Sequence, residues 1–338
     1  MLQDHLTIEQ LSSHLEQLTT KKVLFISKLD HGVYHVKLSD KGDVVARVFP
    51  SQDDYSTIKA LSALLGYLSE QGYPAERVVP DSASSVSILA DAIGSGCVLL
   101  TRFAPGNHPE RNRVTFYRIG ALLAKLHALP IPEGTPTGGT WHHLKLGGDA
   151  RDECHGAMQM LEKARQRLQD ADEQAHKDLD SLSDELRRTQ DMLDKEYDNL
   201  PKALVHPDLV PANIIAQEGT ATAGTDRGEW TIVDWAGAGV GVRIFSLAFV
   251  LFIGAIHGKA ILLHAVMKAY RAKIKLEEAE MNVLPQAAYF RFLTIKCWEV
   301  GMGRQTPADV AKQLPWMLET AEKVTSTVRK ILTAPPEE

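Results

Sequence analysis

Cysteine is scarce in this sequence, with three residues in 338: Cys97, Cys154 and Cys297. Their number is odd and they lie far apart, so they form neither the disulfide framework of a small secreted domain nor a metal-ligand spacing. Such usage is typical of a reducing compartment. We therefore expect a cytoplasmic protein.

Long apolar runs are also absent. The longest, residues 245–256, is broken only by Ser246 and Gly254. It falls short of the roughly 20 apolar residues that a membrane-spanning helix needs. The first residues lack the basic and apolar blocks of a signal peptide. We expect a buried core helix over 245–256 and no membrane partner.

An excess of positive charge is lacking too. The 37 Lys and Arg residues are outnumbered by 43 Asp and Glu residues, for a net charge of −6. A nucleic-acid partner would require a basic surface, so this balance argues against one. The chain does have 44% hydrophobic and 24% charged residues. This composition is typical of a globular protein with one large domain or two smaller ones.

The first hundred residues alternate between short apolar runs and turn signals. Helical spacing predicts a helix over 6–18 and a second over 55–70, which ends before Gly72 and Pro74. Five strands are predicted, at 23–29, 33–38, 44–50, 86–91 and 97–103. Residues 1–102 therefore predict a small sheet with one helix across it.

From residue 103 onward the pattern becomes largely helical. Four apolar residues repeat at the spacing of one helical face, namely Ile119, Leu122, Leu123 and Leu126. Several further helices are predicted between residues 246 and 332. The chain thus divides into a small mixed lobe, 1–102, and a large helical lobe, 103–338.

Residues 151–197 contain one glycine and no proline, and their leucines and alanines form a heptad-like seam. One interpretation is a partner-binding coiled coil or a lid over a substrate. The favoured one is an internal helical hairpin, because alanines make a weak dimerisation surface. Thirteen acidic and eight basic side chains give a charge of −5. That charge either steers a cationic substrate or only marks a solvated face.

The most informative segment is 206–213, His-Pro-Asp-Leu-Val-Pro-Ala-Asn, together with Asp234 at the end of an apolar strand. Phosphoryl transfer needs one carboxylate to accept the proton of the acceptor hydroxyl. It also needs an amide oxygen and a second carboxylate to hold magnesium. Asp208, Asn213 and Asp234 form such a set.

A hairpin would bring two members of this set together. Residues 214–216 and 231–233 predict strands, and the polar segment 217–229 predicts the turn that joins them. Asn213 and Asp234 would then be neighbours at the base of the hairpin. Taken singly, each of these side chains could be only a turn or capping residue.

The segments 206–213 and 232–235 resemble the catalytic loop and the metal-binding Asp of the aminoglycoside phosphotransferase and choline kinase family. This resemblance implies an α+β, bilobal, protein kinase-like fold with a small antiparallel-sheet lobe and a large, mostly helical lobe. Residues 1–102 would be the nucleotide-binding lobe and 103–338 the catalytic and substrate lobe, with the nucleotide in a cleft between them.

By this resemblance, Asp208 would be the catalytic base. Asn213 and Asp234 would supply oxygen ligands to Mg²⁺. His206 would pack and hydrogen-bond inside the loop rather than transfer a proton.

The same resemblance implies a nucleotide site, for ATP or alternatively GTP. Arg47, on the third predicted strand, would hold phosphates with its planar guanidinium. The adenine edge would meet backbone groups at the positions of Arg102 and Ala104. Taken alone, Arg47 would be read as a surface residue on an edge strand.

The sequence departs from the family pattern at three supporting positions. Pro207 replaces the glycine between the loop His and Asp. Leu61 lies where a helix usually offers a Glu to the basic residue of the third strand. Ser246 replaces a carboxylate that normally braces the catalytic loop. The base and both metal ligands are retained, which favours an active enzyme.

We expect an ATP- and Mg²⁺-dependent O-phosphotransferase that acts on a small hydroxyl-bearing molecule, with an antibiotic such as an aminoglycoside as the favoured acceptor. The alternative is a catalytically impaired pseudokinase that serves as a nucleotide-binding or regulatory module, with 151–197 as its interaction surface. A protein kinase is disfavoured because no activation segment follows Asp234. The expected assembly is a monomer or homodimer.

Overall fold

The computed structural model divides the chain into two compact units. It describes residues 7–39, 42–49, 54–79, 86–89, 96–171, 173–217, 229–258 and 260–334. The first unit comprises Met1–His108, Pro132–Pro136 and Ile214–Val233. The second comprises Pro109–Ile131, Thr137–Asn213 and Asp234–Glu338.

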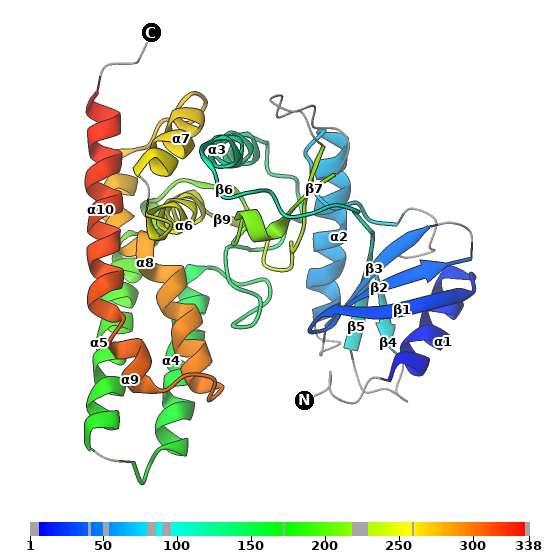
Figure 1. Ribbon diagram of the computed structural model, residues 1–338, viewed down its shortest axis with the longest axis horizontal. Helices are drawn as coiled ribbons and strands as arrows, with labels where there is room; N and C mark the ends of the chain where they lie inside the picture. The colour runs from blue at the N-terminus through cyan, green and yellow to red at the C-terminus, as the bar shows by residue number, and fades with distance from the viewer. Residues whose placement is uncertain are drawn as a thin grey trace. The chain divides into compact units, whose positions relative to one another are not determined.

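Most of the strands that the structure describes belong to the first unit (Figure 1). Its elements are α1 (Ile8–Thr19), β1 (Val23–Asp30), β2 (Val33–Leu38), β3 (Asp43–Phe49), α2 (Tyr55–Glu70), β4 (Val86–Leu89), β5 (Gly96–Arg102), β7 (Ile214–Ala216) and β8 (Trp230–Ile232).

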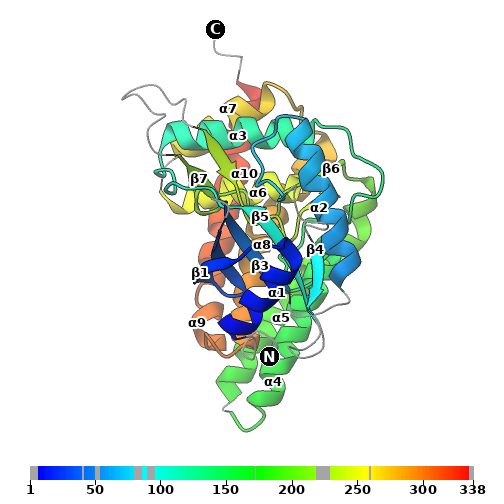
Figure 2. The same ribbon diagram turned by 90° about the vertical axis from the view of Figure 1, so that its right-hand side faces the viewer.

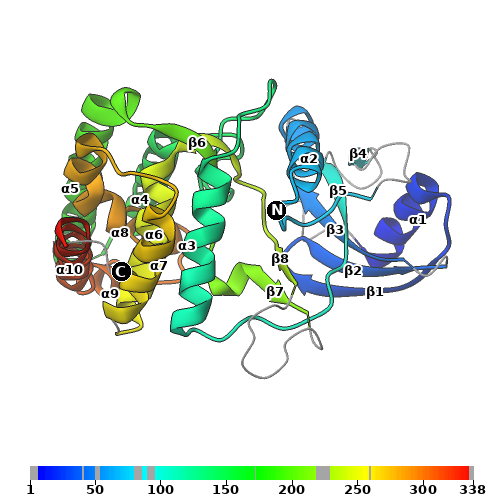
Figure 3. The same ribbon diagram turned by 90° about the horizontal axis from the view of Figure 1, so that it is seen from above.

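The second unit is mostly helical (Figure 3). Its elements are α3 (Arg113–His127), α4 (Ala150–Arg167), α5 (Glu173–Glu196), η3 (Tyr197–Asn199), β6 (Lys202–Val205), η4 (Pro211–Asn213), β9 (Gly239–Val242), α6 (Arg243–Ile256), α7 (Ala260–Arg271), α8 (Glu278–Gly301), α9 (Pro307–Ala311) and α10 (Leu314–Thr333).

Five antiparallel strands form the sheet of the first unit in the order β1-β2-β3-β5-β4. Alternate residues of a strand face opposite sides. Helix α1 lies against one side of the sheet (Figure 2). It buries Leu11 and Leu15 there in one cluster with Val36, Ala46 and Leu100. Helix α2 packs on β5 and β4. The sheet therefore carries α1 as well as the single helix predicted to cross it.

The predicted α+β architecture is confirmed: a small antiparallel sheet precedes a mostly helical part. The five predicted strands appear, and their boundaries agree with the predicted ones to within one residue wherever the structure describes them. Four predicted pieces lie outside the described residues: Leu6, Pro50, residues 90–91 and most of the turn, residues 218–228.

In the second unit, α3 and α7 pack against each other. A Cβ added to Gly120 of α3 would overlap the carbonyl oxygen of Val266 on α7. Helix α6 covers the apolar run predicted to be a core helix, and it is buried from Ile244 to Phe252. In the part of the chain that the structure describes, no helix combines the length and the hydropathy needed to cross a membrane.

Helices α4 and α5 form an antiparallel hairpin over the segment with the heptad-like seam. The seam residues Ala157 and Leu161 of α4, and Leu182 and Leu186 of α5, are buried. Both helices also contact α8. The thiol of Cys154 donates a hydrogen bond to the carbonyl of Leu186, at 3.4 Å. The seam therefore packs inside the second unit, as an internal hairpin does.

His127, the last residue of α3, links the stability of this unit to pH. Burial, reinforced by the positive charge of Arg243, lowers its pKa to about 3. Its Nδ1 shares a hydrogen bond with the Tyr270 hydroxyl, at 2.8 Å. The native state therefore holds a neutral imidazole that the unfolded chain would protonate near pH 6.5.

We predict that the contribution of His127 to stability is full above pH 6.5 and falls as the pH drops from there toward 3, because the unfolded chain binds a proton that native His127 does not bind. The contribution is about 1.4 kcal/mol per pH unit. Thermal unfolding at pH 7.5 and pH 5 should show a weaker pH dependence for His127→Gln than for the wild type. His155→Gln, at an exposed position of α4, is the control. Equal pH dependence in all three proteins would contradict this account.

A second prediction concerns the close contact of α3 with α7. Gly120→Ala should destabilise the protein by about 1–3 kcal/mol, because the added methyl forces the Val266 backbone away. Gly66→Ala in α2 is the matched control, since a Cβ there has no neighbour within 4 Å. It should stabilise by up to about 1 kcal/mol through helix propensity. Urea unfolding measures both, and equal effects would refute the packing argument.

Candidate active site

The loop 206–210 follows β6, which pairs antiparallel with β9 from Lys202↔Val242 to Val205↔Gly239. His206 is completely buried. Its Nδ1 accepts a hydrogen bond from the backbone N–H of Asp208, at 3.1 Å. Its ring meets that of Trp235 edge to face, with the centroids 4.7 Å apart. These contacts give His206 a structural role in shaping the loop.

Asp208 and Asn213 lie in direct contact. The side-chain amide of Asn213 donates a hydrogen bond to the carbonyl of Asp208, at 2.8 Å. The N–H of Val210 donates to the same carbonyl, at 3.0 Å. The five-residue spacing thus closes a compact turn. Because the amide nitrogen of Asn213 is engaged, its side-chain oxygen is the atom left for a cation.

Asp234 follows β8 with its backbone in the left-handed region, at φ +66°. Asp and Asn tolerate this conformation better than most residues. Ile214 of β7 pairs with Ile232 of β8, so the chain before 214 and the chain after 232 come together. This is the hairpin predicted from the sequence, with Asn213 and Asp234 at its base.

The electrostatics tie Asp208 to Asp234. Burial, and after it the negative charge of Asp234, raises the pKa of Asp208 to about 6. The positive charge of Arg291 and the hydrogen bond from Asn213 oppose that rise. Two carboxylates close enough to perturb each other form a site that favours a cation.

The oxygen-rich set fits Mg²⁺, which prefers carboxylate and amide oxygens and keeps part of its water shell. Asn213 and Asp234 offer one amide oxygen and one carboxylate beside a second, destabilised carboxylate, Asp208. Among the described residues, no three His, Cys, Asp or Glu side chains cluster as a self-contained metal site. A metal held here would therefore draw further ligands from water or substrate oxygens.

A glycine-rich contact supports the chain after Asp234. The N–H of Gly138 donates to the Val240 carbonyl and the N–H of Gly139 to the Gly237 carbonyl, both at 2.9 Å. A Cβ on Gly138 would overlap the backbone of Gly239. Only glycine lets these two backbones approach so closely.

Two charged residues that no sequence pattern identifies form hydrogen bonds to the segment that follows Gly138. Glu153 of α4 and Arg291 of α8 form a buried ion pair, with 2.8 Å between Oε2 and Nη1. They are 138 positions apart and belong to helices whose polar faces look ordinary in the sequence. Local spacing therefore offers no means of identifying them.

The predicted nucleotide residues belong to the first unit. Arg47 is half-buried on β3, opposite Val33 of β2 and Leu99 of β5. The N–H of Arg102 donates to the Arg77 carbonyl, at 2.7 Å. An adenine contact at Arg102 would therefore use its carbonyl, with Ala104 supplying an N–H.

The three departures from the family pattern are visible in the structure. The hydroxyl of Ser246 donates to the carbonyl of His206, at 3.1 Å, so one hydrogen bond to the loop persists without a carboxylate. Leu61 is buried in α2 and offers no charge. Pro207 lies against Gly237, since a Cβ on that glycine would be 3.0 Å from the proline ring.

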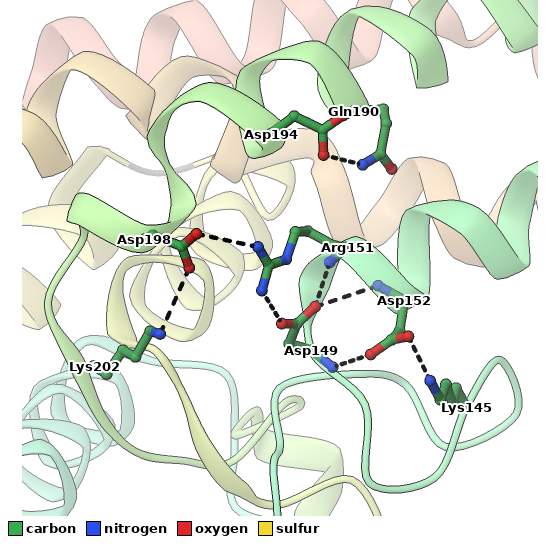
Figure 4. Close-up of polar contacts among 8 residues, drawn as sticks. All are labelled: Lys145, Asp149, Arg151, Asp152, Gln190, Asp194, Asp198 and Lys202. Carbon is green, nitrogen blue, oxygen red and sulfur yellow. Dashed lines mark hydrogen bonds and ion pairs between the residues drawn. The ribbon is translucent and has the colours of Figure 1, made fainter.

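A cluster of charges joins the start of α4 to the end of α5 (Figure 4). Arg151 lies between Asp149 and Asp198, at 3.1 and 3.5 Å, and Lys145 lies 2.5 Å from Asp152. Gln190 donates to Asp194, at 2.7 Å, and Lys202 lies 3.9 Å from Asp198. Each of these carboxylates thus has a partner within the second unit.

Several solved structures share this fold. Amicoumacin kinase hAmiN, in complex with AMP-PNP, Ca²⁺ and Ami, has a TM-score of 0.67 at 14% identity, covering 96% of this chain and 95% of that one. The microcompartment-associated aminopropanol kinase has a TM-score of 0.58 at 18% identity, covering 96% and 97%. The aminoglycoside phosphotransferase from Alicyclobacillus acidocaldarius has a TM-score of 0.59 at 14% identity, covering 94% and 96%. Identities this low show the fold alone.

No curated protein matches the chain. A family model does match it. Residues 23–282, well over half of it, match the phosphotransferase enzyme family. The family predicted from 206–213 and 232–235 is thereby confirmed, together with its kinase-like fold. The chain belongs to the phosphotransferase enzyme family.

Proposed function

We propose that this phosphotransferase moves the γ-phosphoryl group of ATP to a hydroxyl of a small molecule, in a reaction that requires Mg²⁺. The observation that carries the proposal is the Asp208–Asn213 contact with Asp234 close enough to raise the pKa of Asp208. Such an arrangement suits one proton acceptor and two metal ligands.

Asp208 accepts the proton of the acceptor hydroxyl as that oxygen attacks phosphorus. Its raised pKa makes it a better proton acceptor than an ordinary carboxylate. Asn213 and Asp234 hold Mg²⁺, which when bound neutralises charge on the phosphate oxygens. The Asn213 amide keeps the Asp208 backbone in register with the metal ligands.

The nucleotide contacts lie in the first unit. Arg47 binds phosphate oxygens through its guanidinium. Arg102 and Ala104 meet the adenine edge through their backbone. Residues 1–102 thus supply most of the nucleotide contacts, with Ala104 just after them, and residues 103–338 serve catalysis and acceptor binding. ATP is the favoured nucleotide, with GTP as the alternative.

An antibiotic such as an aminoglycoside is the favoured acceptor. Support comes from the fold relatives, which include an amicoumacin kinase and an aminoglycoside phosphotransferase. The aminopropanol kinase makes amino alcohols the second class to test. Phosphorylation with ATP would take place in the cytoplasm.

One observation favours a second candidate, a pseudokinase that binds nucleotide without turnover. Leu61 is buried in α2, where a glutamate would otherwise restrain the basic residue of β3. Arg47 would then depend on other contacts for its position. Mg·ATP binding without acceptor-dependent turnover would select this candidate.

The proposal predicts ADP release in the presence of Mg·ATP and one member of a panel of aminoglycosides, peptide antibiotics, amino alcohols and sugars. Asp208→Ala should lose about 10²–10⁴-fold in kcat, the usual contribution of a general base. A coupled ADP assay measures both proteins. If no acceptor works and Mg·ATP does not raise the melting temperature, the kinase proposal fails.

The pH profile gives a further prediction. Asp208 must be deprotonated to accept a proton, and its pKa is raised to about 6. We expect kcat/KM for Mg·ATP, which reports the enzyme before Mg²⁺ binds, to be level above that pH and to fall about tenfold for each pH unit below it. The profile should be measured with two acceptors of different basicity, so that titration of the acceptor can be separated. A kcat/KM for Mg·ATP that stays constant from pH 7.5 to pH 5 would contradict the role of Asp208.

A further inference from the structure

Arg291 of α8 and Glu153 of α4 form an ion pair that is almost sealed from water, with side-chain exposures of 4% and 0%. Hydrogen bonds to its remaining atoms help to offset the cost of burying such a pair. Among the described residues, Nε and Nη1 of Arg291 have no hydrogen-bond partner. Glu153 accepts from the Thr294 hydroxyl, at 2.5 Å, and from the backbone N–H of Trp141, at 2.8 Å.

Arg291 and Glu153 both form hydrogen bonds to the backbone of one short segment, residues 139–141. Arg291 donates through Nη2 to the carbonyl of Gly139. Glu153 accepts a hydrogen bond from the backbone N–H of Trp141, two residues after Gly139. Residues 139–141 are therefore anchored at both ends by side chains from α8 and α4.

Residues 139–141 contact the chain that follows Asp234. The N–H of Gly139 donates to the carbonyl of Gly237, three residues after Asp234. The backbone of Gly237 lies so close to Thr140 that a Cβ would overlap its carbonyl oxygen. The same Cβ would lie 3.0 Å from the ring of Pro207, the residue before the candidate base. Gly237 thus links residues 139–141 to the loop that carries Asp208.

We propose that Arg291, held by Glu153, is a positioning residue for phosphoryl transfer: it fixes residues 139–141, which in turn hold the backbones of Asp208 and Asp234 in their relative places. This inference rests on the proposed function. Arg291 and Glu153 also act on Asp208 through their charges, which puts the pair within electrostatic range of the site.

The second unit contains a matched control pair. Arg243 and Glu280 form a bidentate ion pair, with Nε 2.9 Å from Oε1 and Nη2 2.7 Å from Oε2. Glu280 is fully buried. Arg243 also donates to the Lys275 carbonyl, at 3.1 Å. The chemistry matches that of Arg291 and Glu153, but none of these contacts reaches residues 139–141.

The test compares Arg291→Lys with Arg243→Lys in the full chain, because each keeps the positive charge and loses the planar fork. Arg291→Lys should lower kcat by about 10²-fold while the KM values for ATP and for the acceptor stay within about threefold. Arg243→Lys should lose a similar amount of melting temperature and keep kcat close to that of the wild type. Equal kcat losses in the two variants, or a loss confined to KM, would overturn the proposal.

A second readout does not need turnover. Trp235 is 1% exposed, follows Asp234 and packs on His206. With 5-fluorotryptophan incorporated, its ¹⁹F resonance is assigned by Trp235→Phe. That resonance should shift in Arg291→Lys and stay in place in Arg243→Lys. An unmoved resonance in Arg291→Lys overturns the positioning role even if the wild type phosphorylates nothing. A shifted resonance supports the anchoring of the Asp234 segment by Arg291, and the kcat comparison then decides whether that anchoring serves phosphoryl transfer.

Discussion

The second unit buries charged side chains next to the segments that carry Asp208 and Asp234, and the rest of its structure depends on how those charges are compensated. A carboxylate removed from water needs a cation or hydrogen bonds, or its pKa rises. Burial raises the pKa of Glu153, and Arg291, Thr294 and the Trp141 backbone oppose that rise. Burial and the charge of Asp234 raise the pKa of Asp208, and Arg291 and Asn213 oppose that rise. Arg291 thus offsets part of the burial of both carboxylates.

Glycine makes that arrangement possible. The segment 138–140 and the chain 237–241 lie backbone to backbone, with no room for a Cβ at Gly138, Gly237 or Gly241. This contact continues the pairing of β6 with β9, which brings the loop 206–210 beside the chain that follows Asp234. Two segments distant in sequence are therefore held together by main-chain hydrogen bonds rather than by mobile side chains.

Local chemistry could be predicted from the sequence. The spacing of Asp208 and Asn213 closes a turn that needs only neighbouring residues, and β7 and β8 pair across a short hairpin. What escaped prediction is long-range: the pairing of Glu153 with Arg291, and the packing of 138–140 on 237–241. Such contacts depend on how helices and loops far apart in sequence come together. The φ of +66° at Asp234 also has no signature, because Asp is common in ordinary turns.

The central claim is a division of labour in which Asp208 serves the chemistry and Asp234 serves the metal. Calorimetric titration of ATP, with and without Mg²⁺, tests it in Asp208→Asn and Asp234→Asn. Asn is suited to both positions because it keeps the size of Asp and tolerates the left-handed backbone. The account predicts that Asp208→Asn binds Mg·ATP like the wild type but does not turn over, whereas in Asp234→Asn Mg²⁺ no longer strengthens ATP binding. Undiminished Mg²⁺-dependent binding in Asp234→Asn, or retained turnover in Asp208→Asn, would contradict it.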